Sequence, residues 1–185
     1  ATGAIYDPAS AKAAHAAGEG ARVTLALGGK SGIPGDAPYE ATFVVEKLSD
    51  GRFKAPGPYY GGRDMDMGPS ACLRIDDVRV VVSSHKAQLA DQAMYRYVGI
   101  EPTEQAILVN KSSVHFRADF QPIAETLLIC AAPSYLDAHG VPAGCGDGRP
   151  GDRGGCALEV VRVEAVLAGQ LAGVGDGAVG QHQVA

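Results

Sequence analysis

The chain has 185 residues, of which 46% are hydrophobic and 20% charged, and its formal net charge is −5. This composition is typical of a folded globular protein and excludes a wholly disordered chain. The mildly acidic balance, without any basic run, argues against a nucleic-acid binder. No apolar stretch reaches the roughly 18 residues that a membrane-spanning helix needs. The first residues show neither an initiator Met nor a secretory signal, so we expect a fragment or a mature form of a longer chain.

The four cysteines are Cys72, Cys130, Cys145 and Cys156. Cys72 and Cys130 lie inside apolar runs, where a free thiol behaves as a small hydrophobic side chain. We therefore expect both to be buried thiols, although four cysteines would also allow three full disulfide pairings. Free thiols fit a reducing compartment, which favours a cytoplasmic location.

The first part of the chain predicts one helix and several strands. Asp7 and Pro8 suit the N-cap and first turn of an Ala-rich helix at residues 9–17. Asp50-Gly51 predicts a hairpin turn into a returning strand, because such a turn needs positive φ. Gly and Pro predict loops at 28–38 and 55–69, and a loop as long as the second is usually functional or disordered. Alternating apolar residues predict the strands, at 21–27, 39–48, 52–54, 71–75 and 78–83.

The second part alternates between short helices and strands. Helical spacing of Leu89, Met94 and Tyr97 predicts a helix at 88–98 that ends at Gly99. A second helix is predicted at 112–120, limited by Pro122. Short buried strands are predicted at 107–109 and 126–130. The element order predicts an α+β (mixed α/β) fold, a largely antiparallel sheet with short flanking helices.

The composition changes after about residue 138. Twelve of the 25 glycines lie from Gly140 to Gly180, and the last Ile, Phe, Tyr and Lys all precede this stretch. Few bulky side chains remain to build a core. We therefore divide the chain into a domain at 1–137 and a Gly/Ala/Val-rich tail at 138–185. The tail is expected to be poorly structured or non-native, although residues 158–167 would suit one strand or helix.

The densest polar cluster is the run Lys111-Ser112-Ser113-Val114-His115-Phe116-Arg117-Ala118-Asp119. It follows a predicted strand and opens a predicted helix, whose free backbone N–H groups favour anions. His115 and Asp119 are four residues apart, so on a helix the carboxylate would orient the imidazole for acid–base work. Arg117 suits a carboxylate, which its guanidinium binds in bidentate fashion. The same run also fits a capped, solvated helix with a structural histidine. The run alone does not distinguish this structural interpretation from the catalytic one.

Other polar patterns give weaker signals. Lys30 follows Gly28-Gly29, where a flexible backbone can approach an anion, but no helix-opening P-loop pattern follows. The histidines and cysteines form no standard zinc motif, and a site made of His139, Cys145 and Cys156 would have unfamiliar spacing. No Gly-x-Ser-x-Gly elbow is present. The residues of this chain therefore do not make a complete catalytic site.

Several segments together resemble the C-terminal region of the MlrC-like proteins, the microcystinase C metallopeptidases. The strongest match is KSSVHFRADFQPIA at 111–124. The others follow in order over roughly residues 4–137: Asp7-Pro8 with its Ala-rich helix, LALGGK at 25–30, LSDGRF at 48–53, Gly57-Pro58, CLRI at 72–75, VVVSS before His85 and YRYVGIEP at 95–102.

The resemblance implies a zinc metallopeptidase or amide hydrolase connected with microcystin degradation, whose zinc ligands lie in an N-terminal domain absent from this chain. It implies that the chain alone is inactive and adds substrate-side groups to a cleft between the domains, with a peptide or small amide as substrate. Carried over by the motif, His115 and Arg117 are the expected catalytic residues. Lys111, Ser112 and Ser113, with Lys30 more weakly, are expected at the substrate, and no metal ligand is expected here. The alternative is a non-catalytic scaffold that packs on a partner domain or forms a homo-oligomer.

Overall fold

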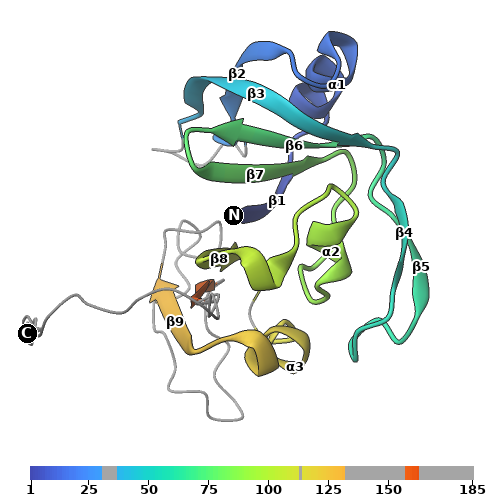
Figure 1. Cartoon of the computed structure of the whole chain (residues 1–185), viewed down its shortest axis with the longest axis vertical. Coiled ribbons are helices and arrows are strands. Elements are labelled where there is room, and N and C mark those ends of the chain that lie inside the picture. Colours follow the sequence, from blue (N-terminus) through green and yellow to red (C-terminus); the bar gives the residue numbers. More distant parts are fainter. Residues whose placement is uncertain (31–36, 113, 132–156, 163–185) are drawn as a thin grey trace, which may run out of the picture.

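The chain folds around a mixed sheet of parallel and antiparallel strands. The computed structural model describes residues 1–30, 37–112, 114–131 and 157–162 of the chain. Within these ranges the sheet has eight strands in the order β2-β3-β6-β7-β1-β8-β10-β9 (Figure 1). β1 is parallel to β7 and β8, and the other neighbours are antiparallel. The predicted α+β class with a largely antiparallel sheet is confirmed. The strands are β1 Thr2–Tyr6, β2 Arg22–Leu27, β3 Tyr39–Ser49, β6 Ser70–Ile75, β7 Val78–Ser83, β8 Ile107–Asn110, β9 Thr126–Ala131 and β10 Ala157–Arg162.

The core forms two layers, one on each face of the sheet. Neighbouring residues of β7 alternate between them, as the period of two in a strand requires: Val81 belongs to one cluster, Val80 and Val82 to the other. Helix α1, Pro8–Ala17, covers the second cluster with Ala11 and Ala14. Segments from the second part of the chain, including Met94, Phe116 and Phe120, cover the first.

Helix α1 forms where the sequence predicts it. The Asp7 carboxylate accepts hydrogen bonds from the Ser10 backbone N–H (3.1 Å) and the Ser10 hydroxyl (2.8 Å), which satisfies an N–H left free at the helix start. Pro8 stands in the first turn and Gly18 ends the helix at φ +88°. In the described ranges no helix is long and apolar enough to cross a bilayer.

The predicted hairpin after β3 is wrong, and the predicted loop 55–69 contains a strand. Strand β4, Arg52–Ala55, pairs with β5, Arg63–Asp66, as a separate two-stranded ribbon, while β6 takes the place beside β3. The chain leaves the sheet at Gly51 and rejoins it at Gly68, where the Met67 N–H donates to the Gly51 carbonyl (2.9 Å).

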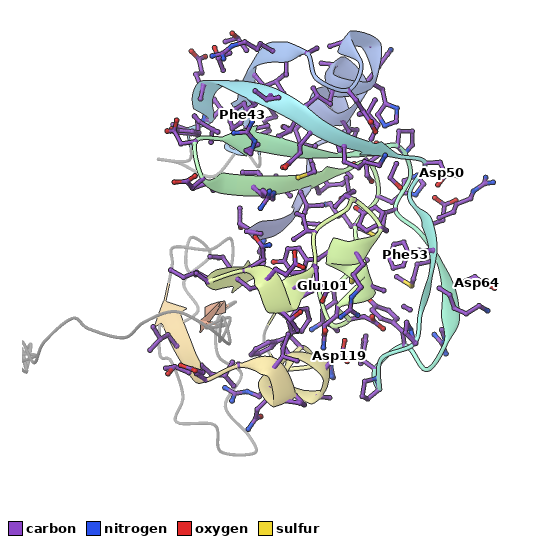
Figure 2. The ribbon with its side chains drawn as sticks, viewed as in Figure 1. Phe43, Asp50, Phe53, Asp64, Glu101 and Asp119 are labelled. Atoms are coloured by element: carbon purple, nitrogen blue, oxygen red, sulfur yellow. The ribbon has the colours of Figure 1, made fainter. Side chains whose placement is uncertain are left out.

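The ribbon packs on the short helix α2, Ala93–Arg96, through an aromatic contact. Phe53 of β4 and Tyr97 stack with ring centroids 4.6 Å apart and an interplanar angle of 24°. Figure 2 shows Phe53 on the side of the ribbon toward α2 and Asp64 on the outer side. The ribbon is thereby fixed beside the second part of the chain.

Both helices predicted in the second part are shorter than expected. α2 begins only at Ala93, whose backbone N–H donates to the Asp91 carboxylate (2.8 Å). Gly99 follows at φ +79°, as predicted. α3 covers Arg117–Phe120 and continues into the 3-10 turn η2, Gln121–Ile123, which contains Pro122. A further 3-10 turn, η1, spans Pro102–Glu104.

An ion pair joins α2 to the residue before η1. Arg96 Nε and Nη2 lie 2.8 and 2.9 Å from the two carboxylate oxygens of Glu101. Hydrogen bonding to Arg96, aided by Thr103, lowers the pKa of Glu101 to about 2. Because this folded-state pKa lies below the ordinary value of about 4.3, the pair stabilises the fold above that pH, and the stabilisation is lost as the pH falls toward 2.

Glu101→Gln tests this ion pair. We expect the free energy of unfolding at pH 7 to fall by about 0.2–1 kcal/mol, a small value because the pair is partly exposed. The difference from the unsubstituted chain should shrink as the pH falls from about 4.5 toward 2. Urea unfolding at several pH values measures it, and a difference that stays constant with pH would contradict the assignment.

The expectations for the cysteines and for the tail are tested only in part by the described residues. Cys72 is a buried free thiol as predicted, and burial first, then the Glu46 carboxylate, raises its pKa to about 12. The Cys130 side chain, Cys145 and Cys156 lie outside the described residues. Of the tail at 138–185 the structure describes residues 157–162, which form β10 between β8 and β9. This strand begins one residue before the segment 158–167, which was expected to suit a strand or helix. The remaining tail residues lie outside the described ranges, so the expectation for them is untested.

Candidate functional site

The candidate site lies where the parallel strands β1 and β8 end. These strands are neighbours and run in the same direction, so their carboxyl ends point to the same edge of the sheet, with Asn110 at the end of β8 beside Gly3 of β1. After β1 the chain enters α1 on one face, and after β8 it enters α3 on the other. In open parallel sheets, a crevice that binds ligands commonly forms where neighbouring connections diverge in this way, and β1 and β8 are such a parallel pair.

The segment after β8 carries most of the expected site residues. Asn110 is fully buried, and its Oδ1 accepts a hydrogen bond from the Tyr95 hydroxyl (2.8 Å). Lys111 is exposed, whereas Ser112 is buried with 3% exposure, and its Oγ accepts from Gln88 Nε2 (3.1 Å). Ser112 therefore anchors this segment instead of capping a helix. Ser113 lies outside the described residues.

His115 is exposed and stacks on Tyr59, with ring centroids 4.3 Å apart and an interplanar angle of 26°. The predicted arrangement of His115 and Asp119 on one helix face is wrong, because α3 begins only at Arg117. The Asp119 carboxylate accepts instead from the Gln92 backbone N–H (2.6 Å). His115 thus contacts the aromatic ring of a remote loop, while the Asp119 carboxylate is hydrogen-bonded to Gln92.

Arg117 stands at the start of α3, next to the buried Phe116. Its guanidinium carbon lies 5.6 Å from the centroid of the Phe116 ring, within the range of a cation–π contact. Arg117 is half-buried. A planar guanidinium so placed, two residues from His115, suits recognition of a carboxylate.

Lys30 reaches the same sheet edge from the other side. Its Nζ lies 2.5 Å from Oδ2 of Asp7, which directly follows β1. Burial raises the pKa of Asp7, but the hydrogen bonds from Lys30 and Ser10 outweigh it, and the net shift is downward. Lys30 therefore neutralises the buried cap of α1.

A second group of residues, which the sequence did not predict, comes from the loop between β4 and β5 and from the approach to α2. The Gly57 N–H donates to the buried Asp91 carboxylate (2.6 Å), and the Tyr60 hydroxyl donates to the Gln88 carbonyl (2.7 Å). These bonds bring the loop against the segment that holds Ser112. Two features of the sequence could have pointed to this loop. They are its length, which is typical of functional or disordered loops, and its Gly57-Pro58 motif.

The two carboxylates Asp91 and Asp119 lie close to Gly57. Burial first, and then the negative charge of Asp91, raises the pKa of Asp119, although the Gln92 N–H acts in the opposite direction. Figure 2 shows Asp119 at α3 facing the side on which the ribbon lies. Both carboxylates are occupied by backbone N–H groups, so they hold loops together.

Comparison with known proteins shows the family of the chain. Residues 1–141 match the model of a protein family described as MlrC C-terminus. The chain belongs to this family. The match covers every motif on which the resemblance was based, and it ends close to the predicted domain boundary at 137.

This MlrC domain is similar to two named proteins. It is 26% identical over 134 residues to Microcystinase C of Sphingomonas sp., which covers 70% of this chain and 25% of that protein. It also resembles the 2.13 Å crystal structure of a candidate metallopeptidase from Mesorhizobium sp. BNC1, with 35% identity and a TM-score of 0.62, over 68% of this chain and 25% of the other. The MlrC domain thus spans about a quarter of the length of either relative.

The donor side chains that the structure describes do not fit a metal ion. Within the described ranges, no three or more His, Cys, Asp or Glu side chains come together in a way that could hold one. His115 stacks on a tyrosine, and the neighbouring carboxylates accept backbone N–H groups. His139, Cys145 and Cys156, the alternative zinc set, lie outside the described residues.

Proposed function

We propose that this MlrC domain forms the substrate side of the active cleft in a zinc-dependent metallopeptidase or amide hydrolase. Membership of the family over residues 1–141 carries the proposal. The names of the two relatives support peptide or amide hydrolysis. Because the domain spans a quarter of their length and its described residues do not fit a metal, we place the zinc ligands in the N-terminal domain implied by the family resemblance.

The roles proposed for individual residues follow from their chemistry. His115 presents an exposed imidazole that can exchange a proton with the substrate or stabilise a developing oxyanion. Arg117 would bind a carboxylate of a peptide substrate, with Lys111 adding positive charge beside it. Ser112 positions the segment through its hydrogen bond with Gln88, and Ser113 is proposed at the substrate because the family motif implies it. Lys30 is a weaker candidate, because it is already paired with Asp7.

The experiment that tests this function uses a full-length enzyme that carries this domain. We expect Arg117→Ala to reduce kcat/KM about ten- to a hundredfold more for a peptide with a free carboxylate than for its amidated counterpart. The reason is that a hydrogen bond to a charged group is worth about 1.5–3 kcal/mol. Steady-state kinetics on the matched substrate pair measures the effect, and melting curves confirm that the variant is folded.

The outcome also separates the cleft from the scaffold alternative. Equal losses for the two substrates would remove Arg117 from carboxylate recognition. Unchanged kinetics for Arg117→Ala and for a His115 variant would favour a domain that packs on its partner, or on a second copy, without touching the substrate.

A further inference from the structure

Tyr59 is the aromatic partner of His115, although the two residues are far apart in the sequence. Their stack forms at the surface, with Tyr59 exposed by 44%. The Tyr60 ring meets Tyr59 edge-on, with centroids 4.8 Å apart and an interplanar angle of 75°. Such aromatic pairs prefer offset stacks and edge-to-face contacts, so this arrangement favours a defined orientation of the imidazole.

The loop that carries Tyr59 is fixed to the segment of His115 by a chain of hydrogen bonds. Tyr60 donates to Gln88, and Gln88 donates to Ser112, three residues before His115. The Gly57 N–H donates to the buried Asp91. The fit is close at this point, because a Cβ on Gly57 would lie 2.7 Å from Asp91 Oδ2 and 3.1 Å from Asp119 Cγ.

We propose that Tyr59 is a positioning residue for His115, a role that rests on the function proposed above for this histidine. A stack uses the face of the imidazole, so both ring nitrogens remain available in the ring plane for hydrogen bonds and proton transfer. A carboxylate partner, as the sequence predicted, would occupy one of them. The Tyr59 ring therefore orients His115 and leaves its acid–base chemistry free for the substrate.

The stack itself is tested by NMR spectroscopy on the 185-residue chain. The unsubstituted chain should show nuclear Overhauser contacts between the Tyr59 and His115 ring protons, and their absence would overturn the proposal. Tyr59→Leu should shift the His115 ring protons downfield, because the ring current of the stacked tyrosine is lost. Tyr59→Phe should keep their positions, since it keeps the ring. Tyr39→Leu, which removes an exposed tyrosine on β3, is the matched control and should leave them unchanged.

The catalytic consequence is tested in a full-length enzyme that carries this domain. Tyr59→Leu should lower kcat about two- to tenfold with little change in KM, and Tyr59→Phe should restore most of it. A rise in KM without a fall in kcat, or a Tyr59→Phe variant that does not restore kcat, would overturn the positioning role. If the NMR results hold but neither Tyr59 nor His115 variants affect turnover, the proposed function of His115 fails while the stack stands.

Discussion

In a full-length enzyme that carries this domain, His115→Ala should lower kcat/KM at least about a hundredfold. General acid–base catalysis by a positioned side chain contributes about 10²–10⁴-fold, and one lost oxyanion donor costs about 10²–10³-fold. The residue is exposed and contributes little to the core, so the melting temperature should change little. Kinetics with a saturating and a limiting substrate concentration separates a loss in kcat from a loss in binding.

A second histidine provides the control for this prediction. His15 lies in α1 on the other face of the sheet, where its Nε2 is 3.0 Å from the Ser70 carbonyl oxygen. His15→Ala removes an imidazole of the same size, and we expect turnover to stay within twofold of the unsubstituted enzyme. A His115→Ala enzyme with full activity would contradict a role for this residue at the substrate.

Gly51→Ala should destabilise the domain more than any other substitution considered above. Gly51 has φ +85°, and an added Cβ would lie 2.1 Å from the Gly68 carbonyl oxygen, a distance that backbone atoms cannot relieve without moving. Positive φ costs a residue with a side chain about 1–3 kcal/mol, and overpacking adds about 1–3 kcal/mol. We expect a loss of about 3–5 kcal/mol in the free energy of unfolding, measured by urea denaturation.

The matched control is Gly20→Ala. Gly20 has nearly the same φ, +83°, but no atom lies within 4 Å of an added Cβ. It should show the conformational cost alone, so the difference between the two variants measures the close approach of Gly51 and Gly68. The point where Gly51 and Gly68 approach each other, here called the Gly51–Gly68 crossing, is the base of the β4–β5 ribbon, and the loop of this ribbon carries Tyr59. Similar losses for both variants would show that the crossing is not tightly packed.

The local sequence predicted those elements whose cause is local. Asp7 and Pro8 marked the start of α1, and the alternating apolar residues at 71–75 and 78–83 marked β6 and β7. The motif at 111–124 located the segment with Lys111, Ser112, His115 and Arg117, and it supported the family membership that the comparison shows. In each case residues within a few positions supply the cap, the turn or the pattern.

The tertiary structure alone decided the centre of the sheet and the partners in the site. β1 is short and carries no clear alternation, yet it lies between β7 and β8, because neighbours on both sides satisfy its backbone hydrogen bonds. A local pattern also cannot show that β4 pairs with β5, since the Gly51–Gly68 crossing joins distant residues. For the same reason the sequence assigned His115 to Asp119, four residues away. The stack with Tyr59 exists only because hydrogen bonds to Asp91 and Gln88 bring a remote loop to that surface.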